Sequence, residues 1–393
     1  MFHKRLIWLF FALVLLGATL KRVSGQACGS ISVRREIRQL SQSEREEFFN
    51  ALKALHNQSQ PISAYDALSQ IHSTYAHEIH SGSAFCPWHR QFLRELEKKL
   101  QQINPKVTLP YWDWTIDSQA PHQSEIFKKE YLGGNGGARG CVSDGPFAGW
   151  KMRYPKPHCL SRNFNHKNTI GSFYSSEVIN NIANNSRNYA DFRGQLESPI
   201  HGVVHMGIGG DMTVMTSPND PLFWLHHAFI DKIWADWQAT NPGRAREYNG
   251  KRTKGGNALP TDIMNPFNVP VSALLDTTAS GLCYRYSNSL PTKRRRGIPL
   301  VNPTDILTEG IEATKLHVPD KLDQQWIQLN GGTLEETRSR EQQFEGIIQK
   351  LNQLKDYISP NARSRRDETL VRLIRGTLGS LFTRVSTPRS IGL

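Results

Sequence analysis

The chain has 393 residues, of which 38% are hydrophobic and 21% are charged. This composition excludes a disordered chain, and the length allows one large hydrophobic core or two unequal ones. The net charge of +13 could suit nucleic acid, but no basic stripe carries the interleaved aromatic residues that favour nucleic-acid binding. We therefore expect no nucleic-acid partner.

The N-terminus predicts export. Residues 1–25 combine a basic start, an apolar run from Leu6 to Leu20 and small residues before a plausible cleavage site, which is typical of a secretory signal peptide. The alternative, a membrane anchor, needs about 20 apolar residues, and this run is shorter. No later segment is apolar enough to span a bilayer. We expect a secreted, extracellular protein without a membrane anchor in its mature form, with glycosylation acceptors at Asn57 and Asn184.

The cysteines number five, and an oxidising compartment favours their pairing with one thiol left over. Cys141 and Cys159 lie close together in a stretch rich in Gly and Pro, and we expect them to pair. Cys28 and Cys283 could then join the ends of the core. Cys86 stands among aromatic residues, where a buried free cysteine acts as a small hydrophobic side chain.

The first hundred residues carry helical patterns. Ser41 and Ser43 each offer a capping box to a first helix. Apolar residues recur at offsets of three and four over residues 65–80, which predicts a second helix that includes His80. A third helix is expected to begin near Trp88.

The next stretch, from Pro110 to Tyr174, is rich in Gly, Pro and Asn and predicts a long irregular excursion on the surface. Helical pattern returns over His201–Met206 and again from Asp220. Asp220 and Pro221 suit the N-cap and first positions of that last helix.

Two triplets of histidines lie on these predicted helices: His72, His80 and His89, and then His201, His205 and His227. Neutral imidazole is a good ligand for copper, zinc or iron, and clusters of histidine suit copper better than magnesium or calcium. Side chains four residues apart lie on the same face of a helix, one turn from each other, and His201 and His205 have this spacing. The two triplets therefore predict a binuclear metal site.

His226 stands beside His227, and adjacent helical residues point about 100° apart. Since only one of the two can face the metal, we take His227 as the ligand and assign His226 to packing or to support of the ligands.

The expected fold is mainly α, a four-helix bundle in which two helices carry each triplet, because metal sites in bundles use inward-facing side chains. Long irregular loops and a smaller C-terminal segment complete it. The pattern changes between Tyr286 and Lys293, so we divide the chain into a signal peptide (1–25), a metal-binding domain (26–288) and a C-terminal segment (289–393).

Two long motifs carry a family resemblance. The segments HSGSAFCPWHRQFLRELEKKL with PYWDW, and HGVVHMGIGGDM with SPNDPLFWLHHAFIDKIWADWQ, resemble the copper-binding motifs of the tyrosinase superfamily of type 3 copper proteins. That superfamily includes tyrosinases, catechol oxidases and molluscan haemocyanins. The resemblance extends from about Val33 to Tyr286.

The resemblance implies two copper ions, one held by the first triplet and one by the second. It also implies that the chain binds dioxygen and oxidises phenolic or catecholic small molecules to quinones. Three histidines per metal leave an open coordination position on each ion, which fits a reactive site.

Departures from the family pattern refine the expected activity. Glu78 occupies the position where some members have a cysteine that forms a thioether, so none is expected. Glu197 resembles a glutamate that orders a water near the coppers, which makes it a candidate catalytic residue for deprotonating a monophenol. Gly202 replaces an asparagine that often assists this glutamate. We therefore expect oxidation of o-diphenols, while monophenol hydroxylation stays open.

One further feature resembles the family. Arg34 or Arg35 is expected to stack on Tyr284 or Tyr286, a clasp that closes the catalytic core. We assign packing and support of the metal ligands, rather than substrate contact, to a polar and aromatic group that comprises Asn219, Asp220, Trp112, Trp114, Phe223 and Trp224.

The C-terminal segment has amphipathic stretches over residues 335–358 and 368–385, whose apolar faces must pack on something. One hypothesis is a removable lid over the metal site, released when a secretory-pathway protease cleaves the basic clusters at Arg296 and Arg366. The alternative is a stable C-terminal domain with solvated basic loops.

Three other functions compete with a copper oxidase. A haemocyanin-like oxygen carrier is disfavoured because the chain has a single pair of histidine triplets, whereas such carriers string many units together. Six histidines do not exclude a zinc-loaded tautomerase. A copper-poor matrix protein is disfavoured by the intact set of histidines.

Overall fold

The computed structural model describes residues 28–57, 62–137, 140–287 and 315–354. The expected signal peptide, both basic clusters and the second amphipathic stretch lie outside the described residues.

Three helices form the N-terminal part. α1 (Gln42–His56) begins after Ser41, whose hydroxyl accepts a hydrogen bond from the Glu44 amide in a full capping box. Ser41, and not Ser43, is therefore the cap. α2 spans Ala64–Ile79, and α3 spans Phe85–Ile103, so α3 begins before the position expected at Trp88.

The second group of helices comprises α4 (Ser176–Asn185), α5 (Tyr189–Gln195), the irregular helical segment η4 (Leu196–His201), α6 (Gly202–Ile208) and α7 (Pro221–Ala239). Asp220 caps α7 as expected, since its carboxylate accepts a hydrogen bond of 2.9 Å from the Leu222 amide. The short 3₁₀ turns are Ile37–Gln39, Pro121–Gln123, Glu125–Phe127, Gly210–Thr213, Ser217–Asn219, Pro242–Arg244 and Val271–Leu274.

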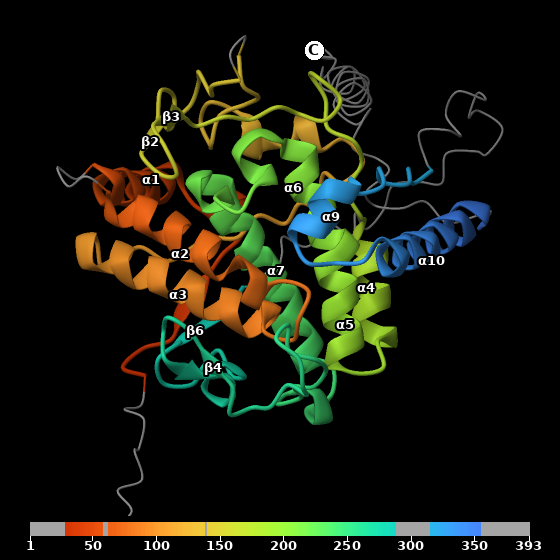
Figure 1. Ribbon diagram of the computed structural model, residues 1–393. Coiled ribbons are helices and arrows are strands. Elements are labelled where there is room, and N and C mark those ends of the chain that lie inside the picture. Colours follow the sequence, from red (N-terminus) through yellow and green to blue (C-terminus); the bar gives the residue numbers. More distant parts are fainter. Residues whose placement is uncertain (1–27, 58–61, 138–139, 288–314, 355–393) are drawn as a thin grey trace, which may run out of the picture.

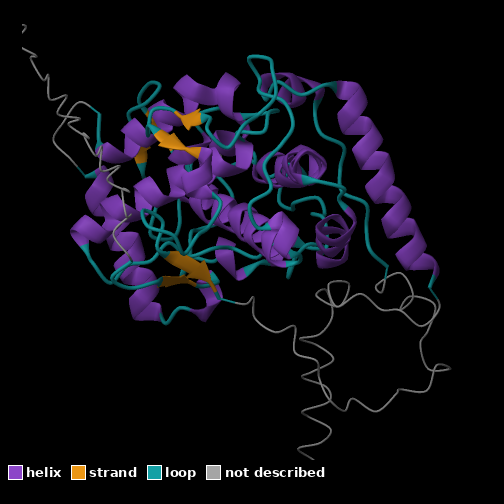
Figure 2. Ribbon diagram, turned by 90° about the horizontal axis from the view of Figure 1, so that it is seen from below, coloured by secondary structure: helices purple, strands orange, loops and turns teal. Residues whose placement is uncertain are grey.

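The expected helical bundle is confirmed: α2, α3, α6 and α7 surround a common centre, and Figure 1 shows α7 passing behind the pair α2 and α3. Strands are few and short, as Figure 2 shows. β1 (Ser32–Arg34) pairs in parallel with β6 (Tyr284–Tyr286), and two antiparallel pairs join β2 (Lys151–Met152) to β3 (His158–Cys159) and β4 (Ile263–Met264) to β5 (Val269–Pro270).

The stretch from Pro110 to Tyr174 is irregular, as expected, but it does not stay on the surface. Trp112, Trp114, Leu132 and Phe147 are fully buried. Large apolar side chains gain free energy when they leave water, and they draw this stretch into the core although its backbone forms no long helix or strand.

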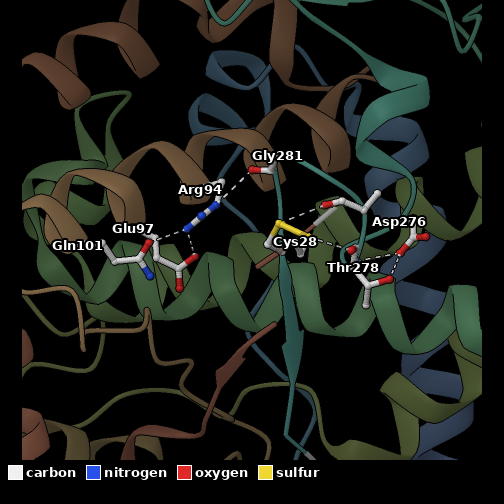
Figure 3. Close-up of a disulfide and its surroundings, with 9 residues drawn as sticks. Cys28, Arg94, Glu97, Gln101, Asp276, Thr278 and Gly281 are labelled. Atoms are coloured by element: carbon white, nitrogen blue, oxygen red, sulfur yellow. Dashed lines mark hydrogen bonds and ion pairs between the residues drawn. A yellow bond between two sulfur atoms is a disulfide. The ribbon is translucent and has the colours of Figure 1, made fainter. Parts of the chain in front are cut away.

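Both expected disulfides are present, joining Cys28 to Cys283 and Cys141 to Cys159, and Cys86 is a buried free thiol. Figure 3 shows the first of them between the N-terminal strand region and the loop that contains Thr278. This bond links residues 255 positions apart in sequence, so it joins the two ends of residues 28–283. Residues 28–287, as far as the structure describes them, are here called the core domain.

The arginine clasp uses Arg34. Its guanidinium lies 3.5 Å from the centre of the Tyr284 ring and donates to both carboxylate oxygens of Glu97. Arg35 instead pairs with Glu44 near the surface. Successive residues of a strand point to opposite sides, so only one of the two arginines can face inward.

The C-terminal part that the structure describes, residues 315–354, is here called the covering segment. It contains α9 (Gln324–Leu329) and α10 (Leu334–Gln353). Figure 1 shows α9 beside α6 and α10 extending outward near α4. None of the described helices combines the length and apolar character needed to cross a membrane.

Candidate metal centre

All six predicted histidines are buried, and the structure gathers them into two adjoining clusters. In the first cluster, His72 comes from α2, His80 directly follows the end of α2, and His89 comes from the second turn of α3. In the second, His201 ends η4, while α6 and α7 supply the other two.

His80 corrects one expectation, because it lies past the end of α2 and not on it. Its backbone is extended, with φ −108° and ψ 156°. Eight residues of continuous helix would leave His72 and His80 about 80° apart around the axis. The extended backbone at His80 instead directs its ring toward the other two members of the cluster.

Hydrogen bonds to backbone carbonyls hold five of the six rings. The Nδ1 atoms of His72, His80 and His89 lie 2.7, 3.0 and 2.8 Å from the carbonyls of Met215, Ala76 and Phe85, and those of His201 and His205 lie 3.2 and 2.6 Å from the carbonyls of Glu197 and Met212. A carbonyl can only accept, so each Nδ1 carries the proton, and each Nε2 presents a lone pair.

The Nε2 atoms converge. Those of His72 and His89 are 3.3 Å apart, and the Nε2 of His227 is 3.2 Å from that of His201 and 3.3 Å from that of His205. Nitrogens bound about 2.0 Å from one tetrahedral metal are about 3.3 Å apart. Two lone pairs that face each other, as in His72 and His89, repel unless a cation lies between them. The donor set therefore fits a metal in each cluster.

The two clusters touch through His89 and His227, whose rings stack with centres 4.5 Å apart. Phe223 also stacks on His227, with the two ring centres 4.0 Å apart. Two ions held in these clusters would therefore be close neighbours, in a pocket walled by aromatic rings.

Burial also keeps these rings neutral. It lowers the pKa of His80 and of His205 to about 4, and burial together with the neighbouring histidines lowers the pKa of His72 well below its usual value. A neutral imidazole has the free lone pair that a metal needs.

His226 also lies within reach of the second cluster. The indole of Trp114 donates a hydrogen bond of 3.1 Å to its Nδ1. In a neutral ring the proton is then on Nε2, so neither nitrogen is free to bind a metal. This contact supports the assignment of His227 as the ligand. It also identifies Trp114 as the residue that orients His226.

Glu197 is buried beside the second cluster, and each of its carboxylate oxygens accepts a hydrogen bond. One accepts from the Ser81 amide at 2.5 Å and the other from Arg193 at 2.6 Å. Burial raises the pKa of Glu197, and the charge of Arg193 opposes this effect. Arg193 was not among the predicted site residues, although its position four residues before Glu197 is a signal for such a pair.

A cavity opens beside both clusters, and the covering segment forms part of its wall. Trp326 of α9 and Asn330 line it. The other lining residues are five of the histidines and a set of uncharged side chains, His72, His80, His201, His205, His227, Met212, Thr213, Val214, Met215 and Ser217. Pattern alone gave no signal for Trp326, because its place depends on how the covering segment docks.

Comparison with known proteins agrees with this site. The common central domain of tyrosinase matches residues 62–240. The tyrosinase ustQ of Aspergillus flavus is 35% identical to the chain over 289 residues, which cover 66% of this chain and 80% of that protein.

Solved structures resemble the chain as well. A mutant polyphenol oxidase from Thermothelomyces thermophila has a TM-score of 0.57 and 25% identity, with 66% of this chain and 89% of that chain covered. A functional unit of octopus haemocyanin, at a TM-score of 0.50 and 21% identity over 65% of this chain and 68% of that one, shares the fold.

Proposed function

We propose that this chain, which belongs to the tyrosinase family of type 3 copper proteins, is an exported oxidase that uses dioxygen to convert o-diphenols to o-quinones. Its cofactor is a pair of copper ions. We assign one ion to His72, His80 and His89 and the other to His201, His205 and His227. The observation that carries this assignment is the convergence of Nε2 lone pairs in two clusters that touch.

When bound, the copper pair supplies the redox chemistry that moves electrons from the phenol to dioxygen. The chain's own residues hold and orient the ligands. Backbone carbonyls fix the imidazole tautomers, and Phe223 stacks against His227. The non-histidine lining that belongs to the core domain is uncharged. A charged substrate group would lose water there without gaining a partner, so we infer a neutral catechol as the preferred substrate class.

Diphenol oxidation is proposed to exceed monophenol hydroxylation. Hydroxylation needs a group that accepts the phenolic proton, and Glu197, the candidate, already accepts hydrogen bonds from Ser81 and Arg193. Gly202 has no side chain that could hold a water beside it. We expect kcat/KM for catechol to exceed that for tyramine, and Glu197→Gln to lower the tyramine value more than the catechol value. Equal losses would refute a proton-accepting role for Glu197.

The covering segment is proposed to act as a lid. Trp326 and Asn330 fill one side of the cavity that a substrate needs, so the intact chain should be less active than a processed one. Cleavage is proposed at the basic clusters near Arg296 and Arg366, which lie outside the described residues.

Export is supported by the two disulfides, which persist in oxidising compartments. Asn57 and Asn184 are exposed, as glycosylation requires. N-terminal sequencing of protein recovered from the medium of an expressing culture tests the cleavage that is expected near Gly25.

The central experiment treats the purified full chain with limited trypsin and measures metal content and catechol oxidation before and after. We expect copper rather than zinc, and an activity that rises when the covering segment is lost. A matched control carries alanine at every basic residue of the two clusters, namely at Lys293, Arg294, Arg295, Arg296, Arg363, Arg365 and Arg366, and should stay uncut there.

Each alternative has its own outcome in this experiment. Equal activity before and after cleavage refutes the lid. Reversible dioxygen binding without quinone formation identifies an oxygen carrier, and zinc in place of copper removes the oxidase assignment.

A further inference from the structure

The indole of Trp326 rests directly on the backbone of Gly202. A methyl group added at Gly202 would lie 2.6 Å from two atoms of the Trp326 ring and 2.8 Å from Leu322 Cδ1. Both neighbours are buried, with Trp326 only 6% exposed. Overpacking of this kind forces side chains out of their rotamers or moves the backbone, so no side chain fits at position 202 while α9 is docked.

Gly202 also adjoins the metal centre, since it directly follows His201. The Trp326 ring lies 6.0 Å from the ring of His201 and 6.3 Å from that of His205, centre to centre. One backbone position therefore borders a metal ligand on one side and the covering segment on the other.

Contacts of the residues that follow Trp326 in the chain restrict where α9 can lie. Ser81 donates a hydrogen bond of 2.6 Å to the Asn330 carbonyl, and Thr337 lies 3.1 Å from Ser198 through their hydroxyl oxygens. Further along, Phe344 is fully buried against Tyr174. The indole cannot slide away from a larger residue at position 202 unless these contacts also break.

We propose that Gly202 is the docking position of the covering segment, because its missing side chain lets Trp326 reach the metal centre. Closure of the segment and any side chain at position 202 therefore exclude each other. The structural part stands on these contacts alone, while its effect on catalysis rests on the proposed lid function. An asparagine at position 202 could not assist Glu197 and leave the segment closed at the same time, because both uses need the same space.

The test is Gly202→Ala in the full chain, read by hydrogen exchange of the α9 amides in metal-free protein. We expect exchange to rise about tenfold or more, as overpacking shifts the segment toward its open state. Gly346→Ala on α10 is the matched control, since a methyl group there meets open space, and it should leave exchange unchanged. Unchanged exchange in Gly202→Ala overturns the proposal.

Trp326→Gly completes the test in two ways. Added to Gly202→Ala, it removes both contacts of 2.6 Å and leaves only the flexible end of Leu322 near the new methyl group, so the double variant should show the exchange of Trp326→Gly alone. A double variant that fails to fold, although Trp326→Gly alone folds, also overturns the proposal.

Trp326→Gly alone separates the two ideas through catechol oxidation by the copper-loaded protein. If this variant raises oxidation while Gly202→Ala leaves α9 closed, the docking role of Gly202 is refuted and the lid function is retained. If Gly202→Ala and Trp326→Gly both open α9 without raising oxidation, the docking role of Gly202 is retained and the lid function is refuted.

Discussion

The core domain and the covering segment meet at one metal centre but are held there by different interactions. In the core, buried charges pair across distant elements, as in Arg34 with Glu97 at 2.8 Å and Arg90 with Asp231 at 2.6 Å. In the covering segment, Arg338 pairs at 2.6 Å with Glu341, three residues away in the same helix. The segment reaches the core mainly through apolar side chains and a few hydrogen bonds.

This difference separates the ways in which the two regions can open. Breaking a buried ion pair leaves a charge without a partner and costs about 3–5 kcal/mol, so the core resists partial opening. We expect the covering segment to detach with the ion pairs inside α10 intact, losing one exposed contact between Asp320 and His166, and its apolar contacts to be lost together. Such a fold would keep the metal ligands fixed if the covering segment were released.

The largest effect is expected from a metal ligand. His205→Ala should remove nearly all catechol oxidation and lower the bound copper by about half, because a histidine site that loses one of three ligands holds its ion poorly. His77→Ala, an exposed histidine on α2, is the control, and activity near normal in His205→Ala would remove it from the ligand set.

The core should respond strongly to Asp231→Ala. This carboxylate accepts hydrogen bonds from Arg90, Tyr284 and Tyr286 at 2.5–2.6 Å. Its loss leaves the buried Arg90 without its charged partner, so we expect the free energy of unfolding to fall by about 3–5 kcal/mol. Urea denaturation measures this loss.

The matched change in the covering segment is Glu336→Ala, which breaks an exposed pair with Arg340. We expect it to cost less than about 1 kcal/mol. Similar costs for Asp231→Ala and Glu336→Ala would contradict the contrast between the two regions.

A third change addresses the apolar docking. Phe344→Ala removes a fully buried ring that packs against Tyr174, and such truncations cost about 3–5 kcal/mol. We expect the covering segment to become sensitive to protease while the core keeps its urea midpoint. A parallel shift of the core midpoint would mean that the segment is an integral part of the core.

Local rules predicted much of the fold and of the site. The capping box at Ser41 and the four-residue spacing of His201 and His205 depend on neighbours in sequence, and the structure has both. The helices that bring the two triplets together follow from apolar periodicity. Arg34 and Arg35 could not be told apart, because the inward face of so short a strand is set by its pairing with β6.

Features that depend on distant contacts could not be predicted. The carbonyl that orients His72 belongs to Met215, 143 residues away. The extended backbone at His80 could not be predicted, because the helical pattern continues up to Ile79. The place of Trp326 is decided by the fit of one indole to one glycine, and no periodicity encodes that fit.

The smallest expected effect concerns Cys86, the buried thiol of α3. Burial raises its pKa to about 12, so at pH 8 the thiolate, the form that attacks disulfide reagents, is nearly absent. We expect a chromogenic disulfide reagent to leave the folded protein unlabelled and to label one thiol per chain in urea, since the other four cysteines are paired.

Cys86 also extends the comparison between the two regions. The same resistance should persist in Phe344→Ala, because Cys86 lies in the core and release of the covering segment leaves the core closed. Rapid labelling of that variant without urea would show that the core opens when the segment leaves, and the separation drawn between the two regions would then be wrong.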